Sequence, residues 1–236
     1  MRSLVQRAPL LLLLLLPTGR SAAPATGKTL GIDVSAAFDD AAAWSCAKKT
    51  SPGPNRTWAI VRAWHSYAAF DNEAPATLAA AKAAGLEHID VYMFPCVSKP
   101  ASTQVDDMIS GLANSRFEAV WIDIETNPST GCAWSNDFAG NCAFVGNLVS
   151  ELTAKRIAVG IYSSHYEWGA VMGSACDGKF KNLPLWFARY SGGPSCDDYA
   201  QEPFGGWTQP YAKQYSDKVD AQTASCGIQG DVDVLC

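Results

Sequence analysis

The sequence lacks the ligand patterns of a metalloprotein. Its 236 residues include only three histidines, and no Cys-x-x-Cys pair or His-Glu-x-x-His motif occurs among them. Protein zinc sites are built from cysteines and histidines at such close spacings. We therefore expect no bound metal, and no segment of the sequence implies an organic cofactor.

Long apolar runs are absent except at the N-terminus. There, an unbroken apolar run spans residues 10–16, follows the basic residues Arg2 and Arg7, and precedes a stretch of small residues. This pattern is typical of a cleaved secretory signal peptide and is too short to span a bilayer. We assign residues 1–23 to a signal peptide and residues 24–236 to one mature domain. We expect that domain to be secreted, either outside the cell or into a lysosome or phagosome lumen, without a membrane partner.

Positive charge is in the minority. The chain has 18 lysines and arginines against 23 acidic residues, and loss of the three arginines within residues 1–23 changes the formal net charge from −5 to −8. An acidic surface disfavours nucleic acids and anionic membranes as partners, so we expect neither, and we expect a monomer. Because 48% of the residues are apolar and only 17% are charged, a disordered chain is excluded.

Eight cysteines lie in the expected mature domain. An even number of cysteines in a secreted chain indicates four disulfides, whose connectivity the sequence leaves open. We predict one local bridge, between Cys132 and Cys142, because it would close a single surface loop. Asn55 begins an Asn-Arg-Thr acceptor sequence between prolines and glycine, and we expect a glycan there.

Short apolar segments alternate with helical patterns along the domain. Strands are predicted at residues 30–34, 58–64, 88–94, 119–125, 158–163, 185–188, 212–215 and 231–235. Helices are predicted at residues 74–84, 102–113 and 142–155, with Gly85 as a C-terminal cap and Ser102 or Thr103 as an N-terminal cap.

Alternating strands and helices predict an α/β protein with a parallel sheet and right-handed crossovers. Eight strands in one domain fit a closed TIM-like barrel in which the last helices are reduced. A doubly wound open sheet is the alternative, and it is disfavoured because no Gly-x-Gly-x-x-Gly motif follows the first strand.

Acidic residues lie at the ends of several predicted strands. Asp123 and Glu125 are two residues apart, so their side chains share one face, at the strand end where barrels place their active sites. Asp33 ends the first strand and Asp233 lies in the last, which closure of a barrel makes neighbours; we expect Asp231 to face outward. Mutual repulsion separates the pKa values of close carboxylates, as acid catalysis at a glycosidic bond requires. Solvated strand ends are the alternative for the Asp-x-Glu motif alone.

Aromatic residues gather at the same strand ends. Aromatic rings suit the flat C–H faces of sugars, although core packing is the simpler explanation for any one of them. The candidates for a sugar-binding wall are Tyr92, Phe94, Tyr162, Trp186 and Tyr190. Gln214 is a candidate for hydrogen bonding to the substrate.

Seven short segments, taken in order, resemble glycoside hydrolase family 25, the Chalaropsis-type lysozymes or N-acetylmuramidases. They are GIDVS (31–35), VYMF (91–94), WIDIE (121–125), GIYS (160–163), LWFARY (185–190), QYS (214–216) and DVDV (231–234). The run from Tyr92 to Cys96 is similar to the eukaryotic branch found in nematodes, amoebae and other invertebrates.

The resemblance implies a barrel of five β/α units closed by three further strands. It implies retaining hydrolysis of the β-1,4 bond after N-acetylmuramic acid, which makes bacterial peptidoglycan the expected partner, in defence or digestion. By the same resemblance Glu125 is the general acid/base and Asp123 orients the N-acetyl group or stabilises positive charge. Asp33 and Asp233 complete an acidic floor, and Tyr92, Tyr162 and Trp186 line the sugar subsite.

Two residues depart from the family pattern. His65 stands where bacterial members carry a glutamate, and Met93 replaces a histidine. Two other functions stay open. A chitinase-like hydrolase would carry a longer acidic run, Asp-x-x-Asp-x-Asp-x-Glu, which is missing before Glu125. A non-catalytic saccharide-binding or immune-recognition protein would have no need of the acid pair.

Overall fold

The computed structural model describes residues 28–50 and 56–236. The expected signal peptide and the expected glycan site at Asn55 lie outside the described residues. Within them, no helix combines the length and the apolar character that crossing a membrane requires.

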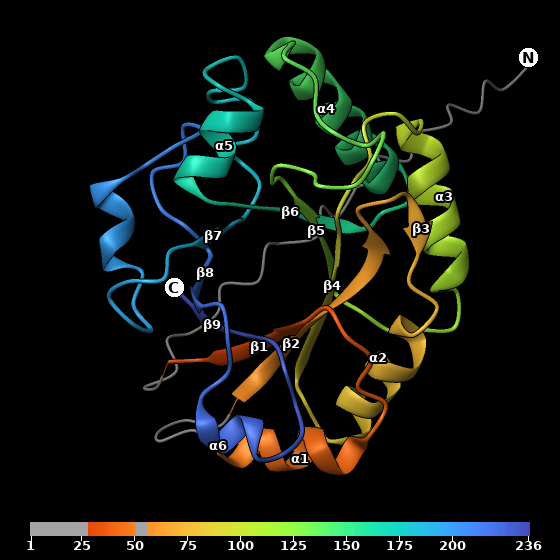
Figure 1. Ribbon diagram of the computed structural model, residues 1–236, viewed down its shortest axis with the longest axis vertical. Coiled ribbons are helices and arrows are strands. Elements are labelled where there is room, and N and C mark those ends of the chain that lie inside the picture. Colours follow the sequence, from red (N-terminus) through yellow and green to blue (C-terminus); the bar gives the residue numbers. More distant parts are fainter. Residues whose placement is uncertain (1–27, 51–55) are drawn as a thin grey trace, which may run out of the picture.

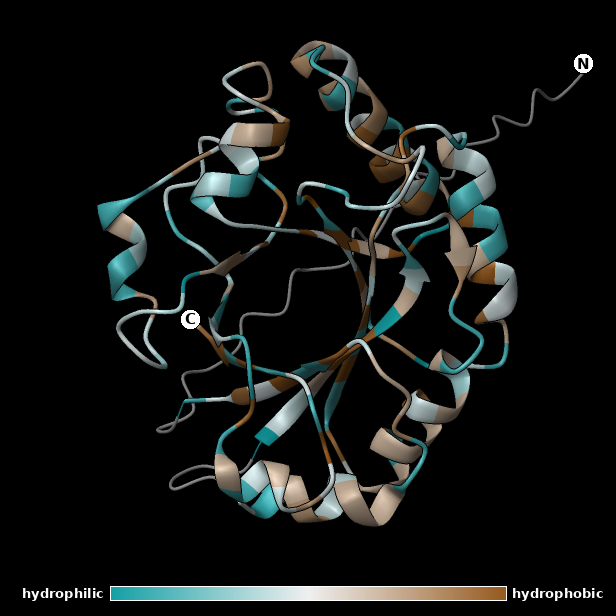
Figure 2. Cartoon of the chain, in the orientation of Figure 1, coloured by the Kyte–Doolittle hydropathy of each residue, from teal (hydrophilic) through white to brown (hydrophobic). Residues whose placement is uncertain are grey.

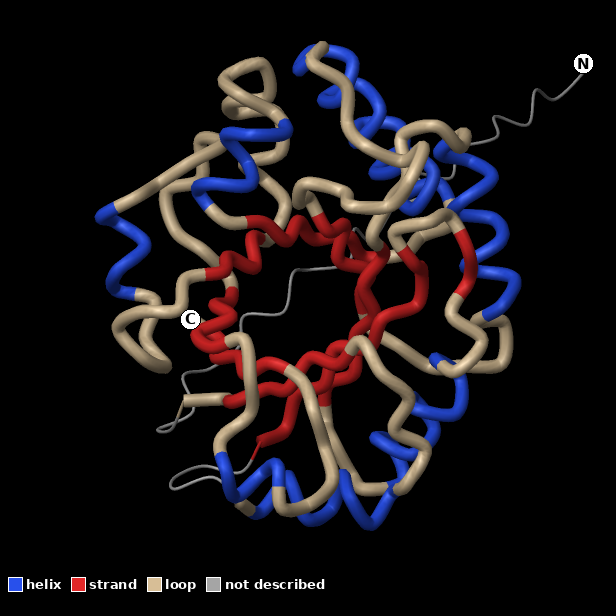
Figure 3. Tube along the Cα trace, in the orientation of Figure 1, coloured by secondary structure: helices blue, strands red, loops and turns tan. Residues whose placement is uncertain are grey.

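Eight strands of the described chain close into a barrel, with helices around its outside (Figures 1 and 3). The strands are β1 (Leu30–Val34), β2 (Arg56–His65), β4 (His88–Met93), β5 (Ala119–Asp123), β6 (Ala158–Ser163), β7 (Leu185–Ala188), β8 (Ala212–Ser216) and β9 (Asp231–Leu235). β1 pairs with both β2 and β9, which closes the ring and excludes the open doubly wound sheet. All eight predicted strands are present.

One strand of this ring runs against the other seven. The pairings from β1 through β2 and round to β8 are all parallel, whereas β9 runs antiparallel to both β8 and β1. The two-residue strand β3 (Ala69–Phe70) pairs with the end of β2 outside the ring. The start of β9 therefore lies at the same end of the barrel as the carboxyl ends of the other strands.

The larger helices follow the early strands. They are α1 (Ala41–Lys49), α2 (Ala74–Ala83), α3 (Ala101–Gly111) and α4 (Phe138–Ala154). The later connections hold only α5 (His165–Val171), the 3-10 turn η1 (Asp197–Gln201) and α6 (Ala221–Ala224). The last helices are reduced, as the sequence predicts. The sequence analysis did not predict α1.

The helix caps were predicted only in part. Gly85 follows α2 with a φ of 78°, as a C-terminal glycine cap requires. The predicted caps of α3 were wrong, because that helix begins after Pro100 and contains both Ser102 and Thr103. α4 begins earlier than predicted, since the Asp137 side chain accepts a hydrogen bond from the Gly140 N–H.

Two layers of apolar side chains hold the barrel together. The larger layer lies between the strands and the helices, and Figure 2 shows hydrophobic residues along both. The smaller layer fills the barrel interior, where Trp58, Trp121 and Trp186 meet edge to face with ring centroids 5.8–6.2 Å apart. The barrel is therefore a packed core with a floor of indole rings.

Two glycines leave room for these rings. A Cβ at Gly160 would lie 2.3 Å from the Trp121 ring, and a Cβ at Gly31 would lie 2.8 Å from the Trp58 ring. Neither position can hold a larger residue without displacing a buried tryptophan, because barrel interiors are close-packed.

All eight cysteines are paired, in four disulfides. The bridges are Cys46–Cys226, Cys96–Cys132, Cys142–Cys176 and Cys196–Cys236. The number agrees with the prediction, but the predicted Cys132–Cys142 bridge was wrong. The short spacing in sequence was no guide to the pairing. Cys132, after β5, bonds to Cys96 in the loop after β4, whereas Cys142, in α4, bonds to Cys176 after α5.

Replacing both Cys46 and Cys226 by serine should destabilise the protein more than replacing Cys142 and Cys176. The first bridge spans 180 residues and the second 34, and the chain entropy that a disulfide removes from the unfolded state grows with loop length. We expect a loss of about 5 kcal/mol for the first pair and about 4 kcal/mol for the second. Urea unfolding of both variants at one pH measures this, and an equal or reversed order would contradict the expectation.

Candidate active site

A pocket opens at the carboxyl ends of the parallel strands, directly above the indole floor. Its empty volume is about 330 Å³. It is lined by Asp33, Tyr92, Asp123, Glu125, Tyr162, Trp186, Gln214 and Asp231. Six of these residues were candidates from the sequence as acids or sugar-wall aromatics, Gln214 was a candidate for hydrogen bonding, and Asp231 was not a candidate.

The alternation of side chains along β5 places the two acids of the Asp-x-Glu motif. Trp121 belongs to the interior cluster, whereas Ile122 and Ile124 belong to the layer beneath the helices. Asp123 and Glu125 therefore follow Trp121 on the inner face, one step apart. Asp123 is buried and Glu125 is partly exposed at the mouth of the pocket.

The last strand contributes a different acid from the one predicted. In the antiparallel pairing of β1 with β9, Asp33 lies opposite Asp231, and Gly31 lies opposite Asp233. Asp231 thus lies at the mouth, while Asp233 is fully buried one layer deeper, where its Oδ1 accepts a hydrogen bond from Trp186 Nε1 at 2.9 Å. The expectation that Asp231 faces outward was wrong, because residues two apart on a strand share a face.

Gln214 joins the two sides of the pocket. Its Nε2 donates to Asp33 Oδ2 at 2.9 Å and to Asp231 Oδ2 at 3.1 Å. Its Oε1 accepts hydrogen bonds from the hydroxyls of Tyr162 and Tyr190, both at 2.8 Å. One buried amide therefore holds two carboxyls and two phenols in place, and all of its hydrogen-bonding capacity is used within the protein.

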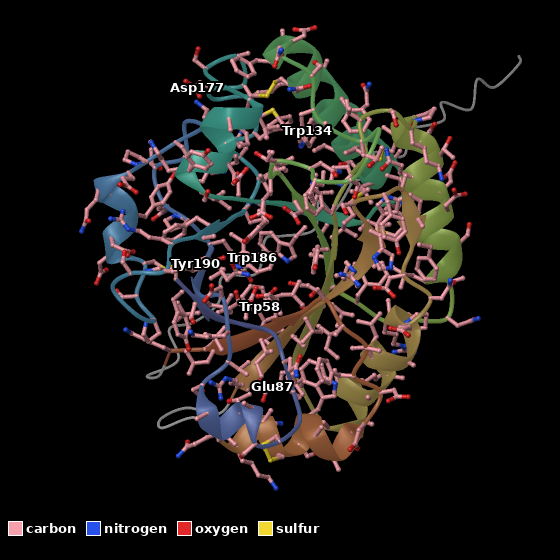
Figure 4. The ribbon with its side chains drawn as sticks, viewed as in Figure 1. Trp58, Glu87, Trp134, Asp177, Trp186 and Tyr190 are labelled. Atoms are coloured by element: carbon pink, nitrogen blue, oxygen red, sulfur yellow. A yellow bond between two sulfur atoms is a disulfide. The ribbon has the colours of Figure 1, made fainter. Side chains whose placement is uncertain are left out.

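The aromatic candidates lie at different depths. Tyr92, Tyr162 and Trp186 line the pocket, and the Tyr162 and Trp186 rings are 4.3 Å apart. Tyr190 is 55% exposed at the rim, and Figure 4 shows it beside Trp186, with Trp58 also inside the ring of strands. Phe94 lies just beyond the end of β4 and is not among the residues that line the pocket.

Burial raises the pKa values of the acids at the mouth. Desolvation, reinforced by the Asp231 carboxylate, raises the pKa of Asp33 to about 8. Desolvation, reinforced by the Glu167 carboxylate, raises the pKa of Glu125 to about 7, and the nearby Tyr162 hydroxyl offsets this only in part. Desolvation also raises the pKa of Asp231, to about 6.

The pKa values of the two deeper acids, Asp123 and Asp233, are also raised. Burial raises the pKa values of Asp123 and Asp233 well above the ordinary range, with added repulsion from Glu125 and Asp33 respectively. The Asp233 carboxyl group lies against that of Asp33, whereas Asp123 Oδ1 has no hydrogen-bond partner among the described residues. Since Asp123 lines the pocket, its free oxygen is available to a bound ligand.

Two contacts that the sequence analysis did not identify support Glu125. Trp134 Nε1 donates to the Glu125 carbonyl oxygen at 2.7 Å. The Glu167 carboxylate accepts hydrogen bonds from Thr126, the residue after Glu125. The sequence holds one signal for Glu167, the pattern Ser-x-x-Glu directly after β6, and none that singles out Trp134.

The described residues contain no group of three or more histidine, cysteine, aspartate or glutamate side chains arranged to hold a metal ion. The ionisable groups that line the pocket are carboxyl groups and tyrosines, with an indole beside them. A closed barrel that gathers such a group at the carboxyl ends of its strands is an architecture suited to glycoside hydrolysis.

Comparison with known proteins agrees with this class. The family model "Lysozyme-like protein 1" matches residues 25–215. A probable GH family 25 lysozyme of Dictyostelium discoideum is 35% identical over 86% of this chain and 88% of its own length. Lysozyme-like protein 5 of Caenorhabditis elegans is 33% identical over 75% of this chain and 79% of its own length. The GH25 lysozyme structure from Aspergillus fumigatus superposes with a TM-score of 0.68 at 22% identity, covering 89% of this chain and 94% of that one.

The protein is thus a glycoside hydrolase with a TIM-like barrel. It belongs to glycoside hydrolase family 25, the family of lysozymes that the ordered sequence segments resemble.

Stability should fall as the pH rises from about 4 to about 8. The pocket acids have higher pKa values in the folded chain than the ordinary value of 3.8, up to about 8 for Asp33. In that window the native state binds more protons than the unfolded state, so raising the pH favours unfolding. We expect the protein to be roughly 2–4 kcal/mol less stable at pH 8 than at pH 5, measured by urea unfolding.

Asp33→Asn should flatten this pH dependence, since it removes the acid with the highest stated pKa. Asp177→Asn, at an exposed position, is the matched control and should leave the slope unchanged. Equal slopes in the wild type and in Asp33→Asn would contradict the assignment.

Proposed function

We propose that the protein is a secreted muramidase. It hydrolyses the β-1,4 bond between N-acetylmuramic acid and N-acetylglucosamine in bacterial peptidoglycan, with Glu125 as the general acid/base. The observation that carries this proposal is the position of Glu125, a partly exposed acid whose pKa is about 7, at the mouth of a pocket whose other acids are more deeply buried or tied by hydrogen bonds.

Glu125 can act first as an acid and then as a base. A carboxyl group with a pKa of about 7 holds its proton under mildly acidic conditions and transfers it to the glycosidic oxygen as the C1–O bond breaks. The resulting carboxylate then takes a proton from the water molecule that attacks C1. A pKa close to the working pH favours both steps.

Asp123 supports the sugar side of the reaction. It is the last residue of β5 and lies one step deeper than Glu125, which follows the strand, and its Oδ1 has no partner within the described protein. That oxygen accepts a hydrogen bond from the N-acetyl N–H of the substrate, while the acetamido oxygen bonds to C1 and displaces the leaving sugar. The positive charge that develops on the ring-closed acetamido group is then next to a carboxyl group, and attack by water reopens it with retention.

The remaining pocket residues hold this arrangement. The Gln214 amide keeps Asp33 and Asp231 at the wall, and Tyr92, Tyr162 and Trp186 give the pocket flat aromatic surfaces against which a sugar ring packs. Four disulfides, together with the apolar N-terminal run, support a secreted location, because disulfides persist in oxidising compartments. Antibacterial defence and digestion are both consistent with such an enzyme.

Glu125→Gln should abolish release of reducing ends from purified peptidoglycan. Loss of the proton donor should lower the rate by about 10³-fold, because glutamine has the shape of glutamate but no proton to transfer. The products should be identified by mass and by the sugar that carries the new reducing end, with Asp177→Asn as the control. Muramic acid ends from the wild type establish the bond assigned here.

Other outcomes would change the assignment. New reducing ends on N-acetylglucosamine would show that the protein is a hydrolase but that it cleaves a different bond from the one we propose. If the folded protein binds the cell wall but releases no reducing ends, the assignment changes from an enzyme to a recognition protein with the same fold.

The rate should fall as the pH rises through about 7. Above that value Glu125 loses the proton that the leaving oxygen needs, so kcat/KM declines on the basic side with a midpoint near the pKa of Glu125. Initial rates on peptidoglycan fragments between pH 4 and pH 9 at constant ionic strength measure this. A rate that rises from pH 5 to pH 8 would contradict Glu125 as the acid.

A further inference from the structure

The backbone around Glu125 is held from two sides by side chains of other segments. Trp134 Nε1 donates to the Glu125 carbonyl oxygen at 2.7 Å. On the other side, Glu167 Oε2 accepts hydrogen bonds from both the N–H and the hydroxyl of Thr126, each at 2.7 Å. The peptide that follows Glu125 is therefore fixed to α5, a helix from the next β/α unit.

α5 is itself a firm support. Its N-terminal Ser164 accepts a hydrogen bond from the Glu167 N–H at 3.0 Å, which orients the first turn. Trp168, the next residue, is 2% exposed and packs edge to face against Phe180 and Trp207. In a capping box the glutamate side chain would turn back to the Ser164 N–H, but here the Glu167 carboxylate bonds to Thr126, just beyond the neighbouring strand β5.

Glu167 also faces Glu125 as a like charge. Among the groups around Glu125, it has the largest charge effect on the pKa of that carboxyl, second only to burial, and it raises that pKa. The other titratable groups near Glu125 come from several strands, and none of them is a cation. They are Asp33 of β1, Asp123 of β5, Tyr162 of β6, Tyr190 after β7 and Asp231 of β9.

We propose that Glu167 is a positioning residue for Glu125: its carboxylate holds the backbone directly after Glu125 through two hydrogen bonds to Thr126, and so brings a second acidic side chain to the mouth beside it. This inference rests on the proposed function, in which the Glu125 proton reaches the glycosidic oxygen. Like-charge repulsion from Glu167 keeps that proton on Glu125, and it makes the Glu125 carboxylate a better base when water attacks in the second step. Glu167 stays bound to Thr126 and touches no reacting atom.

The two effects of Glu167 can be separated by substitution. Glu167→Gln keeps an oxygen that accepts from Thr126 but removes the charge, whereas Glu167→Asp keeps the charge on a shorter side chain. Thr126→Val keeps the charge of Glu167 but removes the hydroxyl donor. Glu151→Gln, on the outer helix α4, is the matched control for loss of one glutamate charge.

The direct measurement is the titration of Glu125, followed by NMR of ¹³C-labelled glutamate carboxyls in the mature protein. The Glu125 signal is assigned by its loss in Glu125→Gln. We expect Glu167→Gln to lower the Glu125 midpoint by about one pH unit, and to move the basic limb of kcat/KM by the same amount. Thr126→Val, Glu167→Asp and Glu151→Gln should leave the midpoint close to that of the wild type.

An unchanged Glu125 midpoint in folded Glu167→Gln, or an equal shift in Glu151→Gln, would overturn the inference. Unfolding temperatures identify any variant that fails to fold. If Glu167→Gln does so, a lower kcat in Glu167→Asp and Thr126→Val with an unchanged Glu125 midpoint would support the positional role, and a wild-type kcat in both would contradict it. The titration does not depend on turnover. A wild type that releases no reducing ends would therefore overturn the proposed function while the role of Glu167 is still measured.

Discussion

The antiparallel insertion of β9 between β8 and β1 is the constraint on which the pocket depends. It closes the barrel and brings the start of the last strand to the mouth, so that Asp231 lies opposite Asp33. It also places Asp233 one layer deeper, at the indole floor, between Gly31 of β1 and Gln214 of β8. A parallel β9 would reverse this order and would leave the Gln214 amide without one of its two carboxyl partners.

Closing the barrel in this way gathers several carboxyl groups in a buried pocket, where desolvation disfavours their charged forms. Neutral donors, namely an amide, phenols and indoles, surround the carboxyl groups, and no cation bonds to those that line the pocket among the hydrogen bonds and ion pairs of the described residues. Without an ion pair, repulsion and desolvation both favour the protonated forms. The site is therefore electrostatically strained at neutral pH, and the close-packed barrel interior and four long-range disulfides keep it folded.

Strand periodicity accounts for the part of this site that the sequence predicts. Asp123 and Glu125 were placed correctly by their spacing, and Asp33 by its position at a strand end. Asp231 was expected to face outward, but residues two apart on a strand share a face, so it joins Asp233 inside the barrel. The direction of β9, which has no signature in an alternating pattern, decides that Asp231 is the one at the mouth. Disulfide partners meet only after the helices pack on the barrel, and for that reason the spacing of Cys132 and Cys142 was no guide.

The two acids at the end of β5 show how a single segment produces two chemically different groups. Asp123 and Glu125 are successive residues on the inner face, but Asp123 is buried and Glu125 is partly exposed. This difference in exposure decides which of them can exchange a proton with a leaving group. The strand alone cannot set how firmly Glu125 holds its proton, because its own neighbours along β5 are apolar or acidic. That property comes from burial in the assembled mouth and from the Glu167 carboxylate in the first turn of α5, both of which raise the pKa of Glu125. Proton delivery at this site is thus a property of the assembled barrel mouth, although the residue that performs it is visible in the sequence.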